Sequence, residues 1–108
     1  MRLLKSPQLI TMANTPGGFS EEKAANAETQ TICDQVKDEV KKTTSKSYED
    51  FTAVKYRYQI VAGTNFIIKV HVGGDNYIHL SVFRSLQGEI MLNGVQEDKR
   101  EPDPLKPF

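Results

Sequence analysis

The sequence is 108 residues long, which is enough for one small domain and leaves no room for a second hydrophobic core. Basic and acidic residues balance at 14 each, so the chain lacks the positive excess that would attract nucleic acid or an anionic membrane. No apolar run approaches the roughly 18 residues that a membrane-spanning helix needs.

Residues 1 to about 25 are predicted to form an extended, poorly ordered arm. Pro7, Pro16 and the pair Gly17-Gly18 interrupt a polar mixture that has neither helical nor strand periodicity. The apolar residues of the start are broken up too early for a secretory leader. The sequence leaves open whether the natural first residue is Met1 or Met12. The double glycine, taken alone, indicates a flexible tether.

One amphipathic helix follows the arm. Asn26 is a suitable N-cap, and Glu28 would lie in the first turn, where its charge complements the helix dipole. Ile32, Val36 and Val40 recur at four-residue spacing and form a narrow apolar stripe. We expect this helix to end near residues 43–45 and to lie on a surface rather than to be surrounded.

After the helix, the apolar period changes from about 3.6 to 2. Residues 54–58, 66–72 and 78–82 each alternate between an apolar and a mixed face, and residues 90–95 form a last short run. Residues 73–76, Gly-Gly-Asp-Asn, are a strong turn signal between two of these strands. The pattern predicts an α+β fold, with one helix laid across an antiparallel sheet of four to five strands that is covered on one side.

The last eight residues, EPDPLKPF, contain three prolines and favour neither helix nor strand. We expect this tail to run over the surface and to dock Leu105 or Phe108.

No catalytic or metal site is predicted. Cys33 with His71 or His79 is the first pair to test as an activated thiol, but Cys33 is two turns into the helix beside Ile32, where packing is the better interpretation. His71 and His79 flank the glycine turn and share strand parity, so we expect them on the outer face of the sheet as surface residues. Nearby Cys, Asp and Glu lack the spacing of a four-ligand zinc site. We therefore expect no enzyme, no cofactor and no bound metal.

The stretch Ile60-Val61-Ala62 is unusual, because it is apolar at a point where a hairpin between two strands should meet water. Either it folds back as core or continues a longer strand, or it is held exposed for a partner. The residues alone leave these alternatives open.

Three segments resemble the cystatins, and especially the disulfide-free stefins (type 1 cystatins). The stretch QIVAGTNFIIKVHVG is similar to the Gln-Val-Val-Ala-Gly signature of that family and its following strand. PGGFSEEKAANAETQTICDQVKDEV is similar to the stefin N-terminal segment and helix, and YIHLSVFRSL to a later strand. The resemblance covers roughly residues 14–108, which we take as the domain, with residues 1–13 as an extension expected to be disordered.

The resemblance implies reversible, tight-binding inhibition of papain-like cysteine proteases of the cathepsin type. In that family an N-terminal trunk and two hairpin loops form a wedge that enters the active-site cleft. Carried over by position, the three elements of the wedge comprise Pro16, Gly17 and Gly18, then Gln59, Ile60, Val61, Ala62 and Gly63, then Leu86, Gln87 and Gly88. A charged residue at Gly63, or deletion through Gly17, is expected to weaken inhibition while the fold survives.

Two departures qualify the likeness. Stefins usually carry Leu-Pro in a longer second loop, whereas Leu86 is followed here by Gln87 and the segment is about three residues short. The residues before Met12 also extend beyond the usual stefin start. The alternative is therefore a stefin-like interaction or domain-swapping module that has lost inhibition. We expect a monomer, with a domain-swapped dimer as the alternative, and a cytoplasmic location, since Cys33 is the only cysteine.

Overall fold

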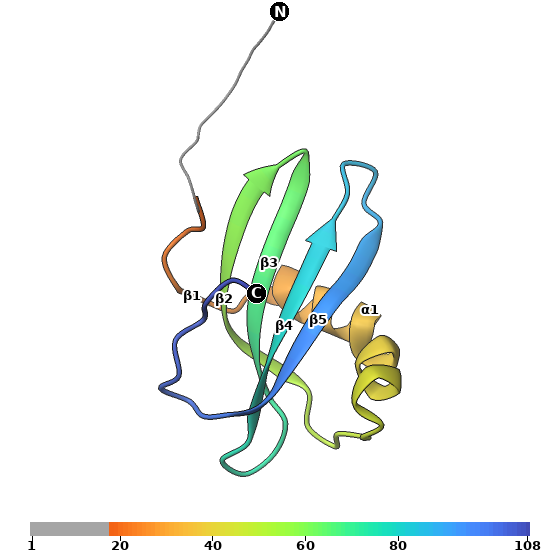
Figure 1. Ribbon diagram of the computed structural model, residues 1–108, viewed down its shortest axis with the longest axis vertical. Helices are drawn as coiled ribbons and strands as arrows, with labels where there is room; N and C mark the ends of the chain where they lie inside the picture. The colour runs from red at the N-terminus through yellow and green to blue at the C-terminus, as the bar shows by residue number, and fades with distance from the viewer. Residues whose placement is uncertain (1–17) are drawn as a thin grey trace, which may run out of the picture.

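A computed structural model describes residues 18–108, and these form one helix packed on a five-stranded antiparallel sheet (Figure 1). The short strand β1 (Lys23–Ala24) precedes the helix α1 (Ala27–Thr44). The strands β2 (Thr52–Val61), β3 (Gly63–His71), β4 (Tyr77–Arg84) and β5 (Ile90–Lys99) follow as a meander. The spatial order β1-β2-β3-β4-β5 is the order along the chain. The predicted fold class is confirmed.

The helix begins and ends where its sequence predicts. Asn26 accepts a hydrogen bond from the Thr29 amide at 2.9 Å, and its own amide donates to Thr29 Oγ1 at 2.8 Å, so the cap is reciprocal. Ser45 adopts the left-handed conformation at φ 60°, and its amide donates a hydrogen bond to the Lys41 carbonyl. This left-handed cap ends the helix.

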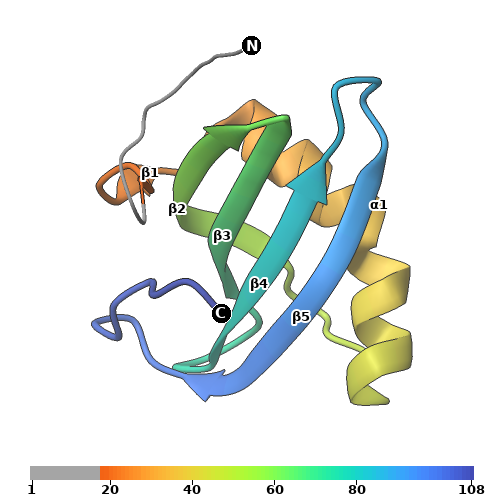
Figure 2. The ribbon, with the colours of Figure 1, turned by 45° about the horizontal axis from the view of Figure 1, so that its top comes forward.

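The helix covers one face of the sheet (Figure 2). Its predicted stripe of Ile32, Val36 and Val40 is buried, and it packs in one core with residues of the two strands β3 and β4, namely Phe66, Ile68, Val70, Ile78, Leu80 and Val82. Cys33 is also part of this core. None of the described helices is long and apolar enough to cross a membrane.

The N-terminal arm is more ordered than its composition suggests. Lys23 and Ala24 pair with Tyr56 and Lys55 of β2, and the Ser20 amide donates to the Tyr58 carbonyl at 2.7 Å. The expectation of a poorly ordered arm is therefore wrong from Gly18 onward. The physical reason is that the free edge of β2 supplies hydrogen-bond partners that the arm's own sequence does not reveal.

The outer face of the sheet is also covered, by a C-terminal strap that we define as residues 100–108 (Figure 1). Leu105 is fully buried, as the docking prediction required, whereas Phe108 stays 43% exposed. Lys69 lies beneath the strap and donates to the carbonyls of Glu101 and Asp103. Lys69 and His79 are both buried, so the expectation that His79 is a surface residue is wrong.

Candidate binding edge

From Lys55 onward the hairpin between β2 and β3 is regular up to its tip. Ile60 pairs with Thr64 and Val61 with Gly63, which leaves only Ala62 at the bend. Behind the bend, Asn65 Nδ2 donates to Gln59 Oε1 across the two strands at 3.0 Å. Ile60 is 72% exposed and Val61 is 46% exposed. Burial as core is excluded. Ile60 and Val61 continue the strand β2 to its end, and its pairing holds their apolar side chains exposed to water.

Gly63 has a structural role in placing this tip. Its φ is +118°, in the region that favours glycine, and an added Cβ would lie 2.5 Å from the Arg84 carbonyl oxygen and 2.6 Å from the Phe83 ring. The hairpin can approach the end of β4 this closely only because no side chain intervenes. A glutamate at Gly63 would therefore disturb the fold, contrary to the expectation from sequence.

The second loop joins β4 to β5 and is compact. Ser85 Oγ accepts hydrogen bonds from the amides of Gln87 and Glu89, and the Ser85 amide donates to the Glu89 carbonyl at 2.8 Å. Gly88 takes a φ of 90° to complete the turn. These contacts occupy the polar groups of the loop and leave the Leu86 side chain 77% exposed.

The third predicted element is only partly within the described residues. Pro16 and Gly17 lie outside them, while Gly18 is exposed at the start of the described chain. Ser20 is bonded to Tyr58, and Tyr58 precedes Ile60 by two residues. Because the arm and β2 run antiparallel, Ser20 lies nearer the hairpin tip than Lys23 and Ala24 do.

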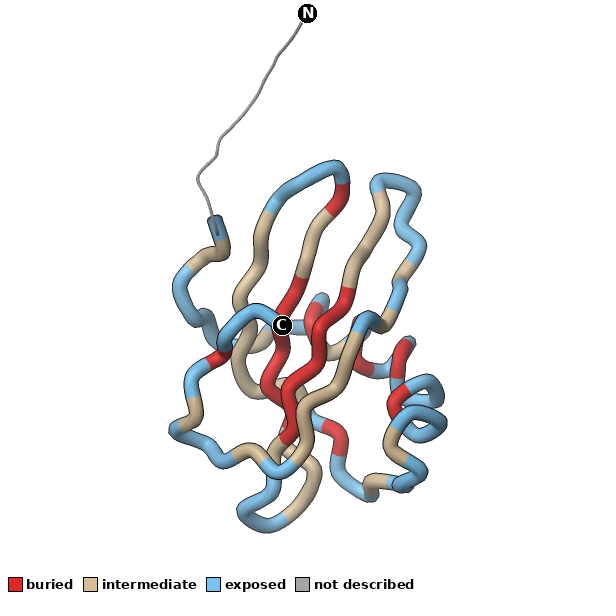
Figure 3. The backbone as a smooth tube through the Cα atoms, in the orientation of Figure 1, coloured by how far each residue is buried: buried red, intermediate tan, exposed pale blue. Residues whose placement is uncertain are grey.

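Both loops lie at the same end of the sheet (Figures 1 and 3). Among the described residues, the large exposed hydrophobic side chains are those of Ile60, Val61, Leu86, Met91 and Phe108. All but Phe108 belong to the two loops or to the strand that leaves the second one, where Met91 pairs with Phe83. The sequence prediction missed Met91, whose polar neighbours gave no signal. We call Ile60, Val61, Leu86 and Met91 the apolar edge.

A groove of about 430 Å³ lies behind the tip on the helix side, lined in part by Tyr58, Ile60 and Phe66. Arg84 closes it, with its guanidinium 2.7 Å from Glu28 of α1 and stacked over the Phe66 ring at 5.1 Å. The ion pair joins the base of the second loop to the start of the helix. The second loop is thus attached to the body of the fold through Arg84.

The remaining candidates for chemistry do not form a site. Burial raises the pKa of the Cys33 thiol to about 12, with Asp34 adding to the effect, so the thiolate that a nucleophile needs is strongly disfavoured. The register places His71 opposite Tyr77 and His79 opposite Lys69, so the two imidazoles do not face each other directly. The packing interpretation of Cys33 is confirmed.

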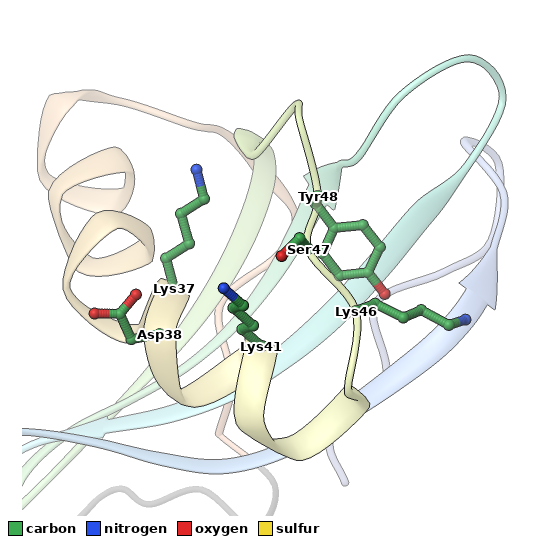
Figure 4. A pocket seen from close by; sticks show the side chains of 6 residues that line it. All are labelled: Lys37, Asp38, Lys41, Lys46, Ser47 and Tyr48. Carbon is green, nitrogen blue, oxygen red and sulfur yellow. The ribbon is translucent and has the colours of Figure 1, made fainter.

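A separate hollow of about 210 Å³ lies between the end of α1 and the segment that follows it (Figure 4). Lys37 and Lys41 of the helix and Tyr48 of the following segment line it. Long flexible cations on an open surface bind no particular ligand strongly, so this hollow adds no candidate function.

Comparisons with known proteins agree with the geometry. The cystatin domain family matches residues 17–101. The chain is similar to leukocyte cysteine proteinase inhibitor 1 of Sus scrofa, with 47% identity over 95 residues, which are 85% of this chain and 92% of the relative. It is similar to cystatin-A of Homo sapiens, with 46% identity over 96 residues, 86% of this chain and 98% of the relative. It is also similar to cystatin-B of Oplegnathus fasciatus, with 42% identity over 95 residues, 85% and 95% of the two chains.

Proposed function

The chain belongs to the cystatin family, and we propose that it is a reversible, tight-binding inhibitor of papain-like cysteine proteases. A cysteine proteinase inhibitor of the stefin type needs a surface that can close an active-site cleft. The observation that carries the proposal is the apolar edge, which sets exposed Ile60, Val61 and Leu86 at one end of the sheet. The N-terminal trunk at Pro16, Gly17 and Gly18 would complete the wedge.

The energetics favour such a wedge. Burial of the apolar surface in a cleft is favourable, and little of this gain is lost in ordering the tip, since its hairpin is already paired. The Gln59–Asn65 hydrogen bond and the close packing of Gly63 fix the tip before any partner arrives. Leu86 and Gln87 in the shorter second loop would add a smaller contact, with Gly88 shaping the turn.

The same geometry predicts that the tip resists cleavage by the protease. The backbone of the tip is held in a hairpin whose paired strands leave only Ala62 free. A protease cleaves an extended segment that fits along its cleft, and the bend at Ala62 presents no such segment. The inhibitor would block the catalytic cysteine and perform no chemistry itself.

Titration of papain with the protein, using a fluorogenic peptide substrate, tests this function. Val61→Asp should raise the inhibition constant at least roughly a hundredfold, because the cleft would bury an unpaired carboxylate. Asn76→Asp, which adds the same charge in the exposed turn between β3 and β4, should leave inhibition unchanged. Absence of inhibition by micromolar wild type would overturn the proposal and favour an interaction module that has lost inhibition.

We also infer that the protein is located in the cytoplasm and is a monomer. Cys33 is the only cysteine and its thiol is buried, so the fold requires no oxidising compartment. Cell fractionation and size-exclusion chromatography check the two inferences.

A further inference from the structure

Arg57 occupies a junction between the two ends of the chain. It lies on β2, and its Nε donates to the Ser20 carbonyl at 2.7 Å while its Nη1 donates to the Leu105 carbonyl at 2.6 Å. The same guanidinium lies 5.8 Å from the centre of the Phe19 ring. One side chain thus holds the arm and the C-terminal strap together.

The strap is itself firmly placed. The Leu105 side chain is fully buried, and the Leu105 amide donates to Glu22 Oε2 of the arm at 3.0 Å. Lys69 of β3 donates hydrogen bonds from its Nζ to the carbonyls of Glu101 and Asp103. The arm is therefore bound to the strap twice, once through Glu22 and once through Arg57, and the strap is anchored on the sheet.

We infer that Arg57, backed by the C-terminal strap, is a positioning residue that holds the arm at Ser20, and with it Gly18 of the trunk, in place for protease binding. Gly18, the described member of the trunk, is two residues before Ser20, so loosening the arm at Ser20 also loosens Gly18. This inference rests on the proposed function, and it assigns to Arg57 and Leu105 a part in inhibition although neither belongs to the wedge.

The chemistry of the guanidinium suits this task. Arginine presents several donors in a rigid plane and can bond two carbonyls at once, and each bond is strengthened by the charge. A lysine has the charge but lacks the fork, so it can hold one carbonyl well and the other poorly. Arg57→Lys should therefore keep part of the function, which a change that merely damaged packing would not predict.

The first test needs no protease. Amide hydrogen exchange in the full-length protein should show the Ser20 amide exchanging roughly tenfold faster or more in Arg57→Ala, since charged hydrogen bonds to the arm are lost. The Leu80 amide in the core strand β4 should be unaffected, which separates loosening of the arm from global unfolding. Unchanged exchange at Ser20 would overturn the inference.

The second test measures dissociation of the full-length protein from papain. Arg57→Ala should raise the dissociation rate about tenfold, with Arg57→Lys between it and wild type. The matched control is Lys55→Ala, because Lys55 lies on the same strand and touches the strap at Glu101, 3.4 Å away, without a hydrogen bond to the Ser20 carbonyl. It should leave both the Ser20 exchange and the dissociation rate unchanged.

A double variant then asks whether Arg57 acts through the trunk. In a Gly17→Glu background, where trunk contacts are already impaired, Arg57→Ala should cause little further loss. The same tenfold loss in that background would overturn the inference. If wild type fails to inhibit papain at all, the proposed function falls, and the exchange at Ser20 still decides whether Arg57 holds the arm.

Discussion

At the residue scale, His79 differs most from what its sequence predicts, because it is buried where the alternation of its strand predicts a surface residue. It stands on the outer face of β4, opposite Lys69, and the strap covers both side chains. Burial, together with the positive charges of Lys69 and Lys99, lowers the pKa of His79 to about 4, although Asp103 and Glu22 act in the opposite direction. The imidazole is therefore neutral in the folded protein over a pH range in which a free histidine is charged.

This shift predicts acid sensitivity of the fold. Between pH 6.5 and pH 4 the unfolded chain binds a proton at His79 that the folded chain does not, so the free energy of unfolding falls as the pH falls. The loss is at most about 3 kcal/mol, from 1.36 kcal/mol per pH unit. Urea unfolding followed by circular dichroism suits a chain without tryptophan.

His79→Gln provides the control for this measurement. The variant retains the carboxylates of the protein but cannot take up the proton, so its free energy of unfolding should decline less steeply between pH 6.5 and pH 4. Equal slopes in the two proteins would mean that His79 is protonated in the folded state.

At the scale of elements, the relative position of the two loops that carry the apolar edge depends on one close contact. Gly63 at the start of β3 lies against Phe83 and the Arg84 carbonyl at the end of β4. The contact fixes the position of the hairpin tip relative to the second loop. A side chain there would separate the hairpins or distort the bend.

Gly63→Ala should therefore lower the free energy of unfolding more than its backbone strain alone predicts. Gly73→Ala is the matched control, because Gly73 has a φ of +117°, nearly the same as Gly63, and its added Cβ meets nothing within 4 Å. We expect Gly63→Ala to cost about 1–3 kcal/mol more than Gly73→Ala in urea unfolding, as overpacking does elsewhere. Equal costs would show that the contact relaxes freely.

The elements differ in how far the sequence predicts them. The helix is set by local signals, namely the Asn26 cap and the stripe from Ile32 to Val40, and it is found where those signals place it. The strands β2 to β5 follow from alternation, although β5 continues to Lys99, beyond the predicted end at Val95. The stefin likeness and the class of function are confirmed by the family match.

Contacts between distant segments were not predictable in this way. β1 exists because two residues meet the edge of β2, and no periodicity of their own marks them. The burial of Lys69 depends on carbonyls contributed by the strap more than thirty residues later. The apolar tip could be located from sequence because its residues are consecutive. Arg57 could not, because its partners Ser20 and Leu105 are far from it in the chain.

At the scale of the whole molecule, the β2–β3 hairpin is also the hinge on which two chains could exchange halves. Ala62 alone forms the bend, and straightening it would join β2 and β3 into one long strand that crosses to a second copy. The exchanged dimer would preserve the strand pairing of the sheet. It would also remove the bend that holds Ile60 and Val61 exposed, and with it the contact that we propose for the protease.

Incubation at guanidinium concentrations just below the unfolding transition should therefore yield a dimer that fails to inhibit papain, beside a monomer that inhibits it. Insertion of two glycines after Ala62 should lower the dimer fraction, because a longer hinge loop lets each chain fold back on itself more easily than a short one does. The same insertion placed in the exposed turn after Gly74 should leave the dimer fraction unchanged, since that turn is not the hinge. Size-exclusion chromatography followed by papain titration of each peak measures both quantities. A dimer that inhibits as well as the monomer would contradict exchange at this hinge, because the tip would still be free.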